Sequence, residues 1–363
     1  MGKNALYIQI YQEIKNKIDS KEYPDGYRLP TEQEMISTYD VSRITIKKAM
    51  NALAAEKLIH KIQGNGTFVG APPKSQETDS SENKGLIGVV VPGLGVYFGS
   101  SFLEVVINEA RTQGYSVVVG LSNDSQENES QVIDSLIGNG VEGLIIQPVF
   151  SRMYNTEVIR RVLDGHPVVF FDRYIEGVSV SYVGSKNVES VKNAMSYLFE
   201  LGHSNVAFLS PSAYTSSIKE REKGYILAYS ASKHILESSH ELMDLDSALP
   251  SSRLKREDDI IKIKRLLSTH PEITAVMCMD HYIATMAKQA AFELGLSVPN
   301  QLSIVSFNAP DDGIYTSIVE NQKALAQAAV RALLGCISQG GGSAIEMIDT
   351  ELHIGSSTAK LDM

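Results

Sequence analysis

The clearest chemistry in this sequence belongs to a short polar run near its start: Ser42, Arg43, Thr45 and Lys47. The run opens a helical pattern, and the first turn of a helix offers unpaired N–H groups that bind phosphate. The planar guanidinium of Arg43 matches the O6 and N7 acceptors of guanine, so we expect it to contact a base. These residue types in this order predict contact with DNA.

Neighbouring residues extend the predicted DNA surface. Ile44 either touches a thymine methyl group or packs in the core, and Asn65, between two glycines, has room to enter the minor groove. The alternative is that Ser42 only caps its helix and that Arg43 and Lys47 only form a solvated face. The full set of candidates is Arg28, Thr31, Glu32, Gln33, Ser42, Arg43, Ile44, Thr45, Lys47, Lys48, Gly64, Asn65 and Gly66.

Three helices and a hairpin are predicted to position these side chains. Apolar residues recur at every fourth position over 6–18, which predicts a first helix. Thr31 and Glu34 stand at the capping-box interval, so a second helix begins there, and Ser42 caps a third. Two short β-prone runs then flank Gly64-Asn65-Gly66, a hairpin signal. Together these elements predict a winged helix-turn-helix.

Three segments of this module, 27–34, 41–49 and 64–69, resemble the GntR family of winged-helix regulators, and they do so in register. The resemblance implies that the residues from Ser42 to Lys47 open the recognition helix and enter the major groove. Gln33 stands where the family often carries a second arginine, so one contact to DNA is expected to differ.

Charge and composition divide the chain into parts. The net charge is −10, yet residues 1–70 carry ten Lys and Arg against eight Asp and Glu. Only this first part has a charge balance suited to phosphate. Residues 71–84 are dense in Pro, Ser and charge and hold no large apolar side chain, so they predict a linker. We therefore expect a DNA-binding domain at 1–70 and a larger domain at 85–363.

The same composition indicates a cytoplasmic protein without a membrane segment. The first residues lack the basic and apolar regions of a secretory signal. The longest apolar stretch, around 86–92, is far shorter than the roughly 20 residues that span a bilayer. Two cysteines, Cys278 and Cys336, show no metal-type spacing, which fits a reducing compartment.

The larger domain alternates apolar strands with amphipathic helices. Strands that are apolar on both faces and are separated by helices predict parallel sheets in α/β layers. The predicted strands are 86–92, 116–121, 143–147, 167–171, 206–209, 275–279 and 302–307. The predicted helices are 101–113, 129–138, 188–201, 221–232 and 282–294.

The order of motifs in this domain resembles the effector domain of the LacI family, which is similar to periplasmic sugar-binding proteins. The motifs are GVVVP at 88–92, VEGLIIQP at 141–148, FFDR at 170–173, REKGY at 221–225 and LSIVSFN at 302–308. The resemblance implies two lobes with a ligand site at the carboxyl ends of their parallel strands. The lobes are expected at 85–183 with 309–325, and at 184–308 with 326–363.

The resemblance also implies a sugar site. Arg221 and Asp280 would each hold two hydroxyl groups, and Asn308 stands where the family usually has Asp. Lys186 also replaces an Asp, which would suit an acidic or phosphorylated effector. Three alternatives stay open: Asp280 only caps a helix, Arg221 lies on the surface, and the two aromatic candidates are core or dimer contacts. The candidates are Tyr97, Phe98, Asp172, Arg173, Arg221, Asp280 and Asn308.

Catalytic motifs are missing from the sequence. It contains no G-x-S-x-G, P-loop or HExxH motif, and Gly93-Leu94-Gly95 lacks the third glycine of a dinucleotide-binding loop. We therefore expect no enzyme activity, no catalytic residues, no cofactor and no metal site.

Joined in this order, the two modules resemble the arabinose-repressor group of bacterial transcription regulators. The resemblance implies a repressor of sugar-utilisation genes that acts as a homodimer on a palindromic double-stranded DNA operator. A sugar such as L-arabinose would release it. A regulator that takes a phosphosugar or a purine as corepressor, and an activator, stay open as alternatives.

Overall fold

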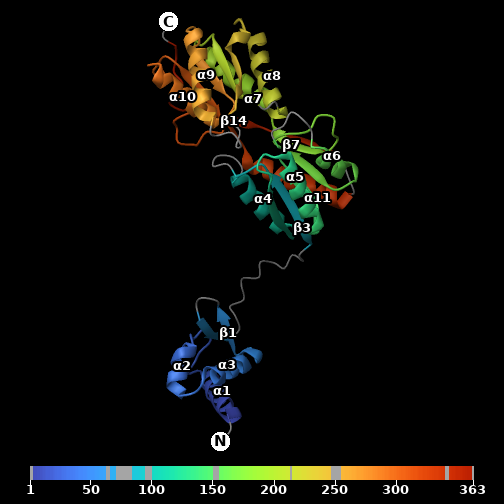
Figure 1. The fold of residues 1–363 in the computed structure, drawn as a ribbon, viewed down its shortest axis with the longest axis vertical. Helices are drawn as coiled ribbons and strands as arrows, with labels where there is room; N and C mark the ends of the chain where they lie inside the picture. Colours follow the sequence, from blue (N-terminus) through green and yellow to red (C-terminus); the bar gives the residue numbers. More distant parts are fainter. Residues whose placement is uncertain are drawn as a thin grey trace. The chain divides into compact units, whose positions relative to one another are not determined.

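The computed structural model describes residues 3–62, 66–70, 84–94, 100–149, 155–212, 215–246, 255–339 and 343–361. They belong to two compact units, Met1–Ser81 and Glu82–Met363 (Figure 1). Within the described ranges, no helix combines the length and the hydropathy that a membrane span requires.

The first unit is a winged helix-turn-helix, as predicted. Its antiparallel hairpin pairs Ile59 with Val69 and Ile62 with Gly66. Ile14, Ile46 and Leu53 form its core together with residues from the wing. The elements are α1 (Lys3–Asp19), α2 (Glu32–Tyr39), α3 (Arg43–Ala55), β1 (Ile59–Ile62) and β2 (Gly66–Val69).

Local hydrogen bonds fix where α2 and α3 begin. The Thr31 hydroxyl accepts from the backbone N–H of Glu34, and the Glu34 carboxylate accepts from the backbone N–H of Thr31. This capping box confirms the predicted start of α2. Asp40 takes a left-handed conformation after α2, with φ 49°. Ser42 then caps α3, so the turn between the two helices is fixed at both ends.

The second unit holds two six-stranded sheets. The first sheet, of the first lobe, has the order β13-β7-β6-β5-β3-β4 and is parallel throughout. Helices α4 and α11 cover one of its faces, and α5 and α6 cover the other. The strands are β3 (Gly85–Val91), β4 (Tyr115–Leu121), β5 (Val141–Ile146), β6 (Val168–Phe171), β7 (Ser181–Ser185) and β13 (Ile345–Ile348). The helices are α4 (Ser100–Thr112), α5 (Gln126–Gly138), α6 (Thr156–Leu163) and α11 (Gln322–Gln339).

The second sheet, of the second lobe, has the order β14-β12-β11-β10-β8-β9, and only β14 runs antiparallel to its neighbour. Helices α9 and α10 cover one face, and α7 and α8 cover the other. The strands are β8 (Val206–Pro211), β9 (Glu241–Leu245), β10 (Ala275–Cys278), β11 (Ser303–Phe307), β12 (Thr316–Glu320) and β14 (Thr350–His353). The helices are α7 (Asn187–Glu200), α8 (Ser216–Ala231), η1 (Ser238–His240), α9 (Arg256–Thr269) and α10 (His281–Glu293).

The last third of the chain corrects the expected lobe boundaries. The chain crosses between the lobes after β7, after β12 and after β13. We expected 309–325 in the first lobe, but β12 pairs with β11 in the second. We expected 326–363 in the second lobe, but most of α11 and all of β13 lie in the first. The reason is packing: Leu325, Ala329 and Leu333 of α11 are fully buried against the first sheet.

Candidate functional site

The predicted recognition helix α3 has one buried face and one polar face. Ile46, Ala49 and Leu53 are fully buried. Arg43 and Lys47 are exposed, as is the neighbouring Lys48. Ile44 is 70 % exposed, so it does not pack in the core and is available to an apolar group outside the unit. The face that would meet DNA is thus basic with one apolar side chain.

The hydroxyl groups of Ser42 and Thr45 are linked at the start of α3. The Ser42 hydroxyl accepts from the backbone N–H of Thr45, and the two hydroxyl oxygens lie 2.9 Å apart. The cap interpretation of Ser42 therefore holds. A capping hydroxyl keeps its own hydrogen, so capping does not exclude donation to a phosphate.

The wing brings Arg28 next to Gly66. Arg28 forms a bridge with Phe68, and a Cβ atom at Gly66 would lie 2.9 Å from Arg28 Nε. Gly66 has a φ of +127°, a conformation that glycine adopts readily. Because glycine has no side chain, it also leaves space for Arg28. Glu32 and Gln33 lie in the first turn of α2, which the Thr31 side chain caps. Gly64 and Asn65 lie outside the described residues.

In the second unit, the predicted effector residues follow the carboxyl ends of strands. Asp172 and Arg173 follow β6, Asp280 follows β10, and Asn308 follows β11. Open α/β sheets bind ligands at this edge. Tyr97 and Phe98 lie outside the described residues.

A buried polar group forms in the first lobe. Asp172 Oδ2 accepts from Gln147 Nε2 at 2.6 Å and lies 3.3 Å from Arg173 Nε. Arg173 Nη1 donates to the Pro148 carbonyl at 2.8 Å. Burial lowers the pKa of Arg173, and the charge of Asp172 opposes that shift. Asp172 also has a φ of 62°, so the backbone itself is held in an unusual conformation at this strand end.

A second buried group forms around Arg221 in the second lobe. Its Nε donates to Asn187 Oδ1 and its Nη1 donates to the Met279 carbonyl, both at 2.9 Å. The guanidinium carbon lies 3.7 Å from the ring centroid of Phe307. The side chain of Arg221 is only 8 % exposed, so the surface alternative is wrong. The guanidinium thus lies over an aromatic ring, with its Nε and Nη1 held by hydrogen bonds.

Glu320 completes this group, and the sequence analysis missed it. Its Oε1 lies 3.6 Å from Arg221 Nη2, and its side chain is 2 % exposed. Its other oxygen, Oε2, accepts from Asn308 Nδ2. Oε1 has no hydrogen-bond partner in the structure. Burial raises the pKa of Glu320, and the charge of Arg221 opposes the rise. A buried carboxylate oxygen without a donor is costly unless a ligand supplies one.

Asp280 and Lys186 have local roles. Asp280 Oδ1 accepts from the Tyr282 backbone N–H at 2.6 Å, so it caps α10; its contact with an effector stays a prediction. Lys186 Nζ pairs with Asp349 Oδ1 at 2.8 Å, where two of the lobe crossings run side by side. Lys186 therefore gives no support to an acidic or phosphorylated effector.

Models of known protein families match both units of the chain. Residues 87–340 match the family model described as a periplasmic binding protein domain. The chain belongs to this family. Residues 6–69 match the model of bacterial regulatory proteins of the gntR family, so this periplasmic-binding-protein chain also carries a GntR-family helix-turn-helix domain.

Relatives of this periplasmic-binding-protein chain are regulators. It is 26 % identical over 322 residues to the arabinose metabolism transcriptional repressor of Geobacillus stearothermophilus, covering 86 % of this chain and 84 % of that one. A putative ribose operon repressor from Burkholderia thailandensis has a similar structure, with a TM-score of 0.65 and 23 % identity over 74 % of this chain and 98 % of that one. A LacI family regulator from Enterococcus faecium with bound ribose gives a TM-score of 0.62 and 18 % identity, covering 76 % and 100 %.

The sequence thus located most of the strand ends of this periplasmic-binding-protein chain but not all the polar groups at them. Gln147, Asn187 and Glu320 contact the predicted residues and were missed. One signal was present: Glu320 is a single carboxylate at the end of the otherwise uncharged run TSIV. This signal was not used, because the strand that ends at Glu320 was not predicted and Glu320 was therefore not recognised as a strand-end residue.

Proposed function

We propose that this chain is a sequence-specific DNA-binding repressor of sugar-utilisation genes, released from its operator by a small sugar. The observation that carries the proposal is the set formed by the buried Arg221 and Glu320 with the half-buried Asn308, in a chain whose first unit presents a basic recognition helix. The names of the relatives, repressors of arabinose and ribose genes, favour the same function. Such a protein acts on the chromosome, so the proposal includes a location in the cytoplasm.

At the operator, Arg43 would contact a base, while Lys47, Lys48 and the N-terminus of α3 would contact phosphates. Residues 1–70 carry a net charge of +2, which gives weak attraction by itself. Two copies in a homodimer would double the contact and match a palindromic operator. Arg28, which lies beside Gly66, would contact the DNA phosphate backbone near the wing.

In the effector site, the polar groups at the strand ends would hold the hydroxyl groups of a sugar. Glu320 Oε1 is a buried acceptor that a sugar hydroxyl would satisfy. Arg221 would donate to ring or hydroxyl oxygens while it stacks on Phe307. Asp172 and Arg173 would bind from the other lobe. A pentose such as L-arabinose is the first candidate, since it carries several hydroxyl groups and no charge.

The switch follows from linkage between the two sites. A ligand held by residues of both lobes favours one relative position of the lobes, and it shifts the dimer only by its difference in affinity between the two states. Operator DNA must weaken sugar binding by the same factor as sugar weakens operator binding.

The proposal is tested by fluorescence anisotropy of the full chain on a labelled duplex that the protein selects from a random-sequence pool. We expect tight binding that L-arabinose or D-ribose reverses. Arg43→Ala should weaken binding to the duplex, and the exposed Arg265→Ala in α9 should not. Tighter binding on addition of ligand would identify a corepressor-type regulator instead. Failure to select any duplex would overturn the proposal.

A further inference from the structure

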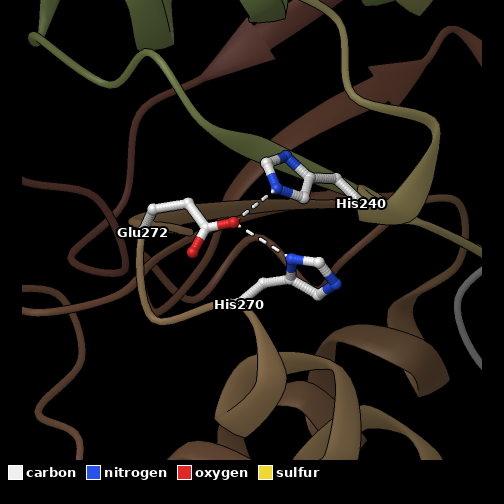
Figure 2. A group of neighbouring side chains, drawn as sticks. All are labelled: His240, His270 and Glu272. Atoms are coloured by element: carbon white, nitrogen blue, oxygen red, sulfur yellow. Dashed lines mark hydrogen bonds and ion pairs between the residues drawn. The ribbon is translucent and has the colours of Figure 1, made fainter.

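Three side chains of the second lobe gather away from the polar groups described above: His240, His270 and Glu272 (Figure 2). Glu272 Oε1 lies 3.1 Å from His240 Nε2 and 3.0 Å from His270 Nδ1. Figure 2 shows both imidazole rings turned toward this one oxygen. One ligand atom from each side chain lies within 4.8 Å of the others. Two imidazole nitrogens thus face one carboxylate oxygen, which brings three metal-type ligand atoms together in one place.

Hydrogen-bonded turns hold all three residues in place. His270 directly follows α9, and its carbonyl accepts from the backbone N–H of Ile273 at 3.1 Å, which closes a turn over Pro271 and Glu272. Ile273 is buried in the core and anchors that turn. His240 ends η1 directly before β9, and its N–H donates to the Glu237 carbonyl. Ligands that are positioned before binding lose little entropy when they bind.

The donor set suits a divalent transition metal. Imidazole nitrogen with carboxylate oxygen is favoured by Zn²⁺ and its neighbours, whereas Ca²⁺ and Mg²⁺ prefer oxygen alone. Zn²⁺ bonds to these atoms are about 2.0–2.2 Å long, so tetrahedral ligands lie roughly 3.4 Å apart. The two N···O distances of 3.0 and 3.1 Å are close to that separation.

We propose that His240, His270 and Glu272 bind one divalent transition metal ion of the zinc type. His240 is a buried ligand, whereas the Glu272 side chain is 46 % exposed, so the ion has a path from solvent and water completes its coordination. When the ion binds, the two nitrogens that face the carboxylate give up their protons or exchange tautomers, and the ion replaces the hydrogen bonds.

The site lies at the other end of the sheet from the proposed sugar site. His240 precedes β9 and Glu272 precedes β10, so both stand at the amino ends of parallel strands. Arg221, Asp280 and Asn308 lie by the carboxyl ends. The ion therefore joins the β9 entry to the turn after α9, and it stabilises the second lobe without touching the sugar.

The sequence predicted no metal site because the ligands carry no recognisable spacing. The two histidines stand 30 positions apart in the sequence, and neither belongs to a Cys/His motif. Only the pairing of β9 with β8, and of β8 with β10, brings residue 240 beside residues 270–272.

The experiment is isothermal titration of ZnCl₂ into the full, tag-free chain after treatment with a chelator. We expect one Zn²⁺ per chain, and at least tenfold weaker binding in His270→Gln and in Glu272→Gln. The matched control is His353→Gln, which removes an imidazole that also contacts a carboxylate, Glu351, but lacks a second histidine. This control should bind Zn²⁺ as the original chain does.

A second set of measurements distinguishes loss of the metal site from misfolding of a variant. His240→Gln removes a buried side chain, so its fold is checked by circular dichroism, and Co²⁺ is used as a spectroscopic probe of the original chain. Absorption bands typical of nitrogen and oxygen ligands should appear with one equivalent of Co²⁺ and disappear in His270→Gln. The proposal is overturned if no Zn²⁺ binds, if His270→Gln binds it with unchanged affinity, or if excess MgCl₂ displaces it.

Discussion

Arg221 and Glu320 hold their charged groups 3.6 Å apart, Nη2 to Oε1, although each side chain is more than nine-tenths buried. Arg221 comes from α8, and Glu320 ends β12, where the chain leaves the second lobe for α11. A ligand that donates to Glu320 therefore acts on a residue next to a lobe crossing. The pair connects the proposed recognition of sugar to the part of the molecule on which lobe movement depends.

Glu320→Gln should weaken inducer binding by about tenfold or more, which corresponds to about 1.4 kcal/mol per factor of ten. The substitution keeps the size of the side chain but removes the charge and one acceptor from the site. Calorimetry with L-arabinose and D-ribose measures the loss, and operator affinity should stay unchanged. The control is Glu351→Gln, which changes an exposed carboxylate on the neighbouring strand β14. Equal affinity in both variants would remove Glu320 from the site.

Inducer binding should depend on pH through Glu320. Burial raises its pKa above the ordinary 4.5, so acidification protonates the carboxylate earlier than in an exposed glutamate and weakens its contact with a hydroxyl donor. Acidification has the opposite effect on the contribution of Glu320 to folding stability, which it increases. The folded chain binds this proton more readily than the unfolded chain, so the contribution is complete below the unfolded pKa and is lost as pH rises through the folded pKa. Titrations of inducer affinity from pH 4.5 upward should show the slope in the original chain and not in Glu320→Gln.

Two substitutions in α3 should separate base contact from phosphate contact. Arg43→Ala should cost about 1–3 kcal/mol of operator binding and relax the sequence preference at one position. Lys47→Ala should weaken binding to all duplexes alike and reduce the slope of log affinity against log salt by about one for each α3 bound. Both variants should bind inducer normally. A Lys47→Ala protein with an unchanged salt slope would show that this ammonium does not contact phosphate.

Gly66→Ala should disturb the wing. The position has a φ of +127°, and the added methyl group would lie 2.9 Å from Arg28 Nε. We expect the first unit to lose more than about 1 kcal/mol of stability, because alanine cannot adopt this conformation without strain. Thermal unfolding followed by circular dichroism measures the change. Gly26→Ala is the comparison: its φ of +81° is also positive, but no atom lies within 4 Å of the added carbon. A smaller loss there isolates the contribution of the Arg28 contact.

Local signals predicted local structure well. The Thr31 and Glu34 capping box, the Ser42 cap and the buried strands β3, β5 and β6 all follow from short patterns, because a cap or an apolar run needs no distant partner. The edge strands β9, β13 and β14 and the interior strands β7 and β12 were missed, whereas the edge strand β4 was predicted at 116–121. β9 and β13 lie at sheet edges and are mostly only half-buried, so they lack a continuous buried run.

The lobe assignment and Glu320 depend on contacts between residues far apart in the chain. After β12 the chain crosses from the second lobe to the first, and the alanine-rich α11 therefore packs on the first sheet. No pattern within 322–339 specifies which of the two sheets this helix contacts. Glu320 is recognisable as a site residue only once β12 lies beside β11, which brings it to Asn308. Likewise, the sequence analysis paired Arg221 with Asp280, but the carboxylate within ion-pair distance of Arg221 is Glu320.

The three crossings between the lobes also set an order of events during synthesis. Neither lobe is a continuous segment, because the core of the first lobe needs α11 and its sheet ends with β13 at residue 348. The helix-turn-helix unit is complete once residue 70 has left the ribosome. At about 5–20 residues per second, the remaining strands follow roughly 14–56 seconds later. The nascent chain therefore contains a complete helix-turn-helix unit well before it contains the complete second unit, which in the proposed function releases the protein from DNA.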